Sequence, residues 1–106
     1  MASREADAQR EILRYLTLMR IFHIRVNTQG VPLHNGSGAF RPAPHRGVAD
    51  ILGIYQRRPL AIEVKSDTGR LTVDQRVFLA QFEAAGGIAF VARSAKDVEA
   101  KLAAAG

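Results

Sequence analysis

The sequence of 106 residues contains no cysteine. This absence excludes a disulfide framework and any zinc site with cysteine ligands, and it fits a reducing cytoplasm. No apolar run approaches the roughly 20 residues that a membrane-spanning helix needs, so we expect no membrane association. The opening residues, MASREADAQREI, mix acidic and basic groups and do not form a secretory signal. We therefore expect a single cytoplasmic domain over residues 1–106.

Positive charge is in excess: the sequence has 15 lysines and arginines and 10 acidic residues, which gives a formal net charge of +5. Guanidinium groups can donate two hydrogen bonds to one phosphate, so an arginine-rich surface favours a phosphate-bearing partner. A small basic protein with no nucleic-acid partner is the alternative that charge alone leaves open. The apolar share of 47% is sufficient for a core.

The spacing of apolar residues predicts an α/β fold with the element order α-β-β-β-α-β-α, which implies a central mixed sheet flanked by helices. The predicted elements are a helix over the first twenty residues, strands over 22–26, 48–55 and 60–64, a helix over 73–85, a strand over 88–91, and a final helix over 94–104. Residues 27–46 are rich in glycine and proline and are predicted to form one long loop. The residues assigned to apolar faces include Ile12, Leu13, Leu16, Met19, Phe22, Phe78, Phe82 and Phe90.

The second and third predicted strands bring acidic side chains together. A turn over 56–59 that sets Tyr55 opposite Leu60 also sets Asp50 opposite Lys65. Because side chains alternate along a strand, Glu63 and Lys65 share one face, and Asp50 joins them there with its carboxylate diagonal to that of Glu63. The sequence therefore predicts two carboxylates and one lysine at the same end of a hairpin.

Such a cluster suits a hard divalent cation, because magnesium commonly takes one or two carboxylates together with waters and substrate phosphate. Lys65 could position or deprotonate an attacking water, or neutralise a phosphate, and the sequence does not decide between these roles. The simpler alternative is an exposed cross-strand ion pair between Asp50 and Lys65, with Glu63 in solvent.

Asp50 followed by Glu63-Val64-Lys65 resembles the metal-binding core of the PD-(D/E)XK nuclease superfamily, and the surrounding motifs resemble its VRR-NUC family. These motifs are Glu5-x-x-x-Gln9, Arg25-Val26-Asn27, Arg46-Gly47-Val48-Ala49-Asp50-Ile51, Glu63-Val64-Lys65, Gly69-Arg70-Leu71-Thr72 and Gln75. One departure is Ala49, since the superfamily often has proline before this aspartate. The resemblance implies a restriction-endonuclease-like core.

The resemblance also implies an endonuclease that depends on Mg²⁺ or Mn²⁺ and hydrolyses DNA. Asp50, Glu63 and the main-chain carbonyl of Val64 would bind the metal, and Lys65 would be the catalytic lysine. Relatives imply branched DNA, such as a flap or a four-way (Holliday) junction, as substrate, a homodimer as the active form, and a bacterial or phage-infected cell as the setting. The alternatives are a non-catalytic DNA-binding module with a nuclease-like fold and a small protein that binds an acidic protein.

Two further catalytic positions are implied by the same resemblance. Glu5 would lie near the metal from the first helix, and Gln75 would face the site from the second. Each has a structural alternative: Glu5 suits a helix N-terminus, and Gln75 forms the capping box Thr72-Val73-Asp74-Gln75.

Polar residues of the long loop and its flanks are expected to contact the DNA backbone, since phosphate contacts dominate affinity that is independent of sequence. The predicted contacts are Asn27, Gln29, Arg41, His45, Arg46 and Arg70. The alternative is a loop that is merely polar. The spacing of His23, His34 and His45 does not favour a histidine metal site.

Overall fold

The computed structural model of the chain describes residues 4–26, 31–32, 40–41 and 46–106. In chain order the described elements are α1 (Glu5–Leu18), β1 (Phe22–Arg25), β2 (Val31–Pro32), β3 (Phe40–Arg41), β4 (Ile51–Tyr55), β5 (Arg58–Val64), α2 (Val73–Ala84), β6 (Ile88–Ala92) and α3 (Ala95–Ala105). None of the described helices is both long enough and apolar enough to traverse a lipid bilayer.

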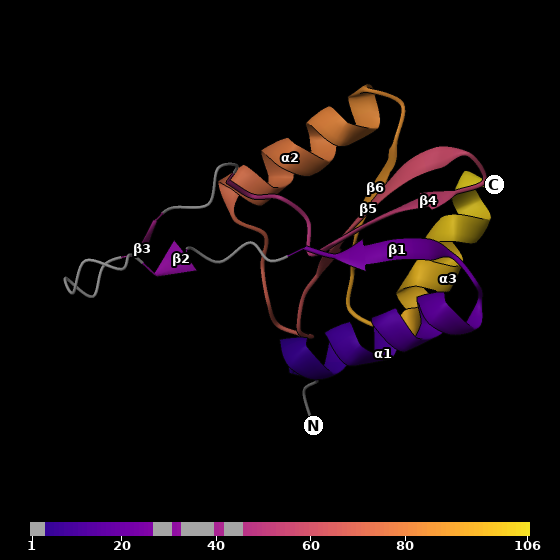
Figure 1. Cartoon of the computed structure of the whole chain (residues 1–106), viewed down its shortest axis with the longest axis horizontal. Coiled ribbons are helices and arrows are strands. Elements are labelled where there is room, and N and C mark those ends of the chain that lie inside the picture. The colour runs from indigo at the N-terminus through magenta and orange to yellow at the C-terminus, as the bar shows by residue number, and fades with distance from the viewer. Residues whose placement is uncertain (1–3, 27–30, 33–39, 42–45) are drawn as a thin grey trace.

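The main sheet has the strand order β1-β4-β5-β6. The first three strands are antiparallel neighbours, whereas β6 runs parallel to β5 after the crossover through α2. Helices α1 and α3 cover one face of the sheet and α2 covers the other, as Figure 1 shows. The expected mixed sheet flanked by helices is therefore present, and the architecture is compatible with a nuclease-like fold.

The hydrophobic core lies between the sheet and the pair α1–α3. Helix α1 contributes residues four apart, which fall on one helical face, and α3 does the same. Alternate residues of β4, β5 and β6 meet them from the sheet. The buried core residues are Ala8, Ile12, Leu16, Ile51, Leu60, Ile62, Val64, Ile88, Phe90, Ala92, Val98 and Leu102.

The opposite face of the sheet is only partly covered, because α2 packs on β5 and β6 and not on β1 or β4. Phe22 is 67% exposed, and Ile24 and Ile54 are each 53% exposed. The assignment of Phe22 to the core is therefore wrong. Met19 is also exposed, because α1 ends at Leu18 and Met19 is its C-cap. Of the other aromatic residues, Phe90 is buried, and Phe78 and Phe82 are half-buried on α2.

The region 27–46, predicted as one long loop, contains β2 and β3, which form a separate antiparallel pair. The predicted element order is therefore incomplete by two short strands. Two residues per strand are too few for alternation to be recognised in the sequence.

The register of the β4–β5 hairpin differs from the prediction. Tyr55 lies opposite Arg58, not Leu60, and the strands are joined by Gln56 and Arg57 with φ of 49° and 70°. Two positive φ angles are typical of a tight primed turn, which usually contains glycine or asparagine, so this turn could not be recognised from Gln56 and Arg57. Pro59 is tolerated because β6 begins opposite Leu60, and no ladder hydrogen bond is required from residue 59.

Candidate functional site

Asp50 and Glu63 lie side by side at one end of the main sheet. Ile51 is opposite Ile62, so one further step along the antiparallel pair brings Asp50 opposite Glu63. The predicted register was wrong by two residues, which is an even shift, and both carboxylates therefore remain on the α2 face. Asp50 is therefore directly opposite Glu63, not diagonal to it as predicted, and it does not lie opposite Lys65.

Neighbouring strands hold Asp50 from both sides. Its Oδ2 accepts a hydrogen bond of 2.8 Å from the main-chain N–H of Val64, and its carbonyl oxygen accepts one of 2.7 Å from Val26. In a strand the N–H and C=O of one residue point to the same side. The carbonyl of Val64 therefore points toward β4, on the side where the Asp50 carboxylate lies.

Lys65 lies beside Glu63, with its Nζ 3.9 Å from Glu63 Oε1. At this distance the two groups form an ion pair, but they are too far apart for a hydrogen bond. Glu63 is only 2% exposed and Lys65 is 9% exposed. The alternative of an exposed Asp50–Lys65 pair with Glu63 in solvent is therefore wrong.

Gln75 joins the site to the first turn of α2. Its side-chain oxygen accepts a hydrogen bond of 2.9 Å from Thr72 N, and its own N–H donates one of 3.1 Å to Thr72 Oγ1. Its Nε2 also donates to Glu63 Oε1 at 3.1 Å. The capping role and the position facing the site are therefore both present, because the two ends of one amide serve different partners.

The surroundings of Glu63 disfavour its negatively charged form. The pKa of Glu63 is raised from 4.5 to about 8, chiefly by burial and then by the negative charge of Asp50 and a hydrogen bond between the two carboxyl groups. Lys65 lowers this pKa and Glu5 raises it. Within the described residues, Glu63 Oε2 is buried and has no hydrogen-bond partner. Glu63 thus has a free oxygen next to a second carboxyl group, with too little positive charge nearby.

Glu5 lies at the start of α1 and is exposed. Its connection with the site is electrostatic, through its effect on the pKa of Glu63. Its place in the first helical turn also fits the structural alternative, because an acid there complements the helix dipole.

A divalent cation fits this donor set. The described part of the chain has no group of three or more His, Asp or Glu side chains that could enclose a metal ion. Magnesium does not need such a cage, since one or two carboxylates with waters suffice. Glu63 Oε2 without a partner, the adjacent Asp50 carboxylate and the Val64 carbonyl are hard oxygen donors, and a cation would offset the repulsion between the two acids.

The residues predicted to contact DNA are only partly described. Arg46 and Arg70 are exposed, which is compatible with phosphate contact. Arg41 is placed by its backbone in β3. Asn27, Gln29 and His45 lie outside the described residues.

The supporting contacts of two residues, Gly47 and Arg93, were not anticipated from the sequence. Gly47 has φ of 73°, and a Cβ there would lie 2.3 Å from the main-chain carbonyl of Asp74, so glycine permits the segment leading to Asp50 to approach α2. The Arg93 guanidinium donates to the main-chain oxygens of Ser66 and, at 2.8 Å, Gly69. No sequence pattern indicated Arg93, because its contacts depend on the parallel register that aligns Val64 with Ala92.

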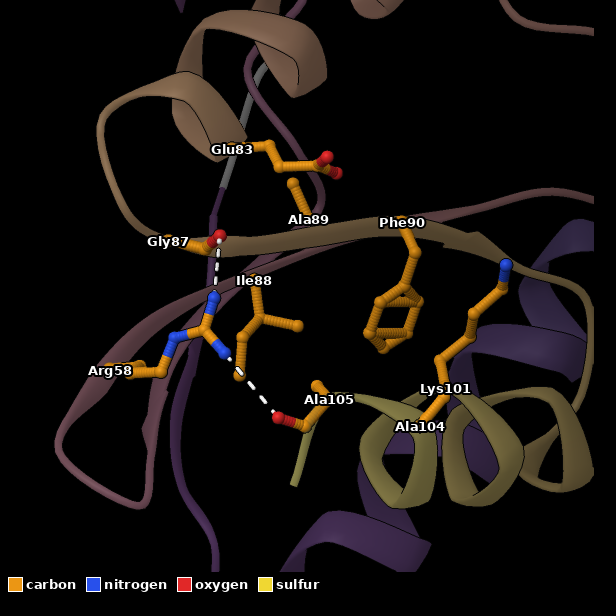
Figure 2. Close-up of a pocket in the computed structure, with 9 residues that line it drawn as sticks. All are labelled: Arg58, Glu83, Gly87, Ile88, Ala89, Phe90, Lys101, Ala104 and Ala105. Atoms are coloured by element: carbon orange, nitrogen blue, oxygen red, sulfur yellow. Dashed lines mark hydrogen bonds between the residues drawn. The ribbon is translucent and has the colours of Figure 1, made fainter.

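A hollow of about 440 Å³ lies along the edge strand β6. Residues of α2 line it on one side of the strand and residues of α3 on the other (Figure 2). Arg58 lies at its edge and donates to the main-chain oxygens of Gly86, Gly87 and Ala105 over 3.4–3.5 Å. None of the predicted catalytic residues lines this hollow. The carboxylate pair, and not this hollow, is therefore the candidate site.

Comparison with known proteins agrees with the geometry. The family model described as the VRR-NUC domain matches residues 44–96. This segment includes the carboxylate pair, Lys65 and Gln75, but not α1 or β1. Among curated proteins, none matches the chain.

Proposed function

Because the chain belongs to the VRR-NUC domain family, whose members are nuclease-like DNA-processing domains, we propose that it is a metal-dependent endonuclease that hydrolyses DNA phosphodiester bonds. The observation that carries this proposal is the pairing of half-buried Asp50 with buried Glu63, beside Lys65, at one end of the sheet. Catalytic sites are where burial and like charges shift pKa values, as at Glu63.

The Asp50 and Glu63 carboxylates and the Val64 carbonyl would hold Mg²⁺ or Mn²⁺. When bound, this cation would stabilise the negative charge that develops on the phosphate and lower the pKa of a water molecule. Gln75 fixes Glu63 Oε1 and leaves Oε2 as the free donor, and the Val64 N–H fixes Asp50. These hydrogen bonds hold both carboxylates in position before substrate arrives.

Hydrolysis forms one P–O bond with the oxygen of water and breaks the P–O bond to the leaving sugar oxygen. Lys65 contributes in one of two ways: its ammonium neutralises a phosphate oxygen, or its amine takes the proton of the attacking water. Its distance of 3.9 Å from Glu63 leaves its hydrogen-bonding capacity for substrate or water.

We further propose branched DNA as the preferred substrate and a homodimer as the active form. One chain offers one carboxylate pair, so symmetrical cutting of a four-way junction requires two chains related by a twofold axis. The exposed apolar side chains of Phe22, Ile24 and Ile54 on the β1–β4 half of the sheet support a dimer, because such patches commonly mark protein interfaces.

The test is cleavage of labelled duplex, single-stranded, flap and four-way junction DNA in Mg²⁺, Mn²⁺ or chelator. We expect cleavage with either cation and none with chelator. Asp50→Asn and Lys65→Ala should each reduce the rate by about 100-fold or more. Lys101→Ala, which removes an exposed positive charge from α3, is the matched control and should cleave normally.

Four results would contradict the proposal. Cleavage that persists in chelator would remove the metal mechanism, and Lys65→Ala that cleaves as fast as the parent would remove the catalytic lysine. DNA binding without cleavage in either cation would identify the non-catalytic module. Binding to DNA that hardly changes with salt would instead indicate an acidic protein as the partner.

A further inference from the structure

A hollow of about 230 Å³ lies between α1 and β1, lined by Ala6, Gln9, Arg10, Leu13 and Arg25. It lies on the face of the sheet that α1 covers, because Arg25 is opposite the core residue Ile51, whereas the two carboxylates lie on the α2 face. Ala6 follows Glu5, whose charge reaches Glu63, and Arg25 is opposite Ile51, the residue after Asp50. The hollow and the carboxylate pair therefore lie at the same end of the sheet.

The hollow has positive charge from two elements. Arg10 comes from α1 and Arg25 from β1, both are exposed, and none of the lining residues is acidic. Arg10 also forms an ion pair of 2.8 Å with Asp7, but both side chains are largely exposed, and such pairs are weak. Guanidinium groups bind phosphate with paired, charge-assisted hydrogen bonds, so this arrangement suits a phosphate.

The hollow lies on the α1 side of the sheet, whereas the described residues that are expected to contact DNA lie on the α2 side. Arg46 and Arg70 belong to the α2 side, since Gly47 contacts the first turn of α2 and Arg70 precedes that helix. In Figure 1 the N-terminal ends of α1 and α2 lie on the same side of the molecule, with the end of β1 between them. A nucleic-acid strand that crosses the carboxylate pair from α2 would next meet α1.

We propose that Arg10 and Arg25 form a second phosphate subsite, which binds a backbone phosphate of the DNA strand next to the bond that is cleaved. This inference rests on the proposed nuclease function and adds to it a contact on the α1 side. Phosphate contacts fix the register of a protein on DNA, so the subsite would position the scissile bond over Asp50 and Glu63.

The test measures equilibrium DNA binding in chelator, where hydrolysis does not interfere, over a series of salt concentrations. Loss of one phosphate contact should weaken binding about three- to tenfold and reduce the slope of log affinity against log salt by about 1. We expect this result for Arg25→Ala. Lys101→Ala removes the same charge from α3 and should change neither quantity, so it separates a specific contact from loss of net charge.

A variant of opposite sign makes the test independent of folding defects. Asp7→Asn removes the acidic partner of Arg10 and should tighten DNA binding by about two- to fivefold at low salt. Glu83→Gln, which removes an exposed acid near the C-terminal end of α2, is its control. It should tighten binding less, because Glu83 does not pair with either arginine of the hollow among the described residues.

The outcomes separate the subsite from the enzyme. If the parent binds and cleaves DNA while Arg25→Ala and Asp7→Asn behave like their controls, the subsite is wrong and the nuclease proposal stands. If the parent neither cleaves DNA nor binds it in a salt-dependent way, the nuclease proposal fails and the subsite fails with it.

Discussion

Glu63 combines deep burial, a neighbouring carboxyl group and one unsatisfied oxygen, and each of these features opposes its negative charge. A carboxylate in such surroundings destabilises the folded state at the pH where it ionises, as long as no cation is bound. Its hydrogen bond from Gln75 offsets only part of this effect. The same features would be relieved by the cation that we propose for this site.

The pKa of Glu63 predicts how stability depends on pH. The folded value of about 8 lies above the ordinary 4.5, so between these values the folded state retains a proton that the unfolded state has released. Rising pH therefore removes stability across this window, and no further loss comes from Glu63 above pH 8. Glu63→Gln, which cannot ionise, should be more stable than the parent at pH 8 in chelator.

Thermal unfolding in chelator at pH 5, 6, 7 and 8 checks this expectation. The Tm advantage of Glu63→Gln should grow with pH and reach about 5 °C, or about 1 kcal/mol for a domain of this size. Glu83→Gln removes an exposed carboxylate from α2 and is the control. A Tm difference that stays constant, or shrinks toward pH 8, would contradict the unfavourable burial of Glu63.

Gly47 provides a second prediction at the scale of single residues. Gly47→Ala would impose a positive φ on alanine and place its Cβ 2.3 Å from the backbone of Asp74. Gly86→Ala is matched, because Gly86 has φ of 104° but its Cβ would meet nothing within 4 Å. The difference between the two variants therefore isolates the contact with α2 from backbone strain.

We expect Gly47→Ala to lower Tm by about 5 °C or more beyond Gly86→Ala. Its cleavage rate should also fall, because Asp50 lies three residues further along the same segment. Equal Tm values for the two alanine variants would show that the close approach of this segment to α2 does not matter.

At the scale of elements, the connection between β5 and α2 begins with Lys65 and leads into the first turn of α2, which holds Gln75. Arg93, which follows β6, donates to the main-chain oxygens of Ser66 and Gly69 within this connection. A guanidinium can satisfy both oxygens at once, whereas shorter or uncharged side chains cannot. Arg93 is thus a positioning residue for the two ends of the site.

Arg93→Ala should therefore increase amide hydrogen exchange over residues 66–72 and lower the cleavage rate about tenfold. Binding of Mn²⁺ should change little, because the carboxylate pair is on β4 and β5. Arg76→Ala, at an exposed position of α2, is the control. Unchanged exchange over residues 66–72 would remove the positioning role of Arg93.

The elements themselves could mostly be predicted from the sequence. The helices and long strands have apolar spacing that the core enforces, as at Ile12 and Leu16 of α1. The hairpin register could not be predicted, because Gln56 and Arg57 adopt left-handed conformations that their residue types do not announce. The acids nevertheless remained on one face, since the error was an even number of residues.

The residues of the candidate site could be named from the sequence, but most of their contacts could not. The resemblance to the VRR-NUC family, confirmed by the family match, indicated Asp50, Glu63, Lys65 and Gln75. The bridge from Gln75 to Glu63 and the link from Arg93 to Ser66 depend on tertiary packing, which local patterns do not encode. The exposure of Phe22 was missed for the same reason, because it depends on which strands α2 covers.

For the whole molecule, the uncovered apolar face of β1 and β4 predicts self-association. Light scattering at about 10 μM should give twice the 11.6 kDa mass of one chain. Phe22→Ser should shift this mass toward the monomer. Leu18→Ser, which alters an equally exposed apolar residue of α1, should not.

A monomeric mass for the parent chain would contradict the dimer, and so would dissociation by Leu18→Ser to the same extent as by Phe22→Ser. Neither result would touch the carboxylate pair, which lies within one chain. Cutting of branched DNA by a monomer would then have to proceed one strand at a time.

The most direct test of the central claim is calorimetric titration of Mn²⁺ into the protein at pH 7, in two buffers of different ionisation enthalpy. Because the pKa of Glu63 is about 8, binding at the carboxylate pair should release about one proton. Asp50→Asn should weaken binding at least tenfold, and Glu63→Gln should abolish the proton release. Binding that is absent in the parent, or that is unchanged in both variants, would contradict a cation site formed by Asp50 and Glu63.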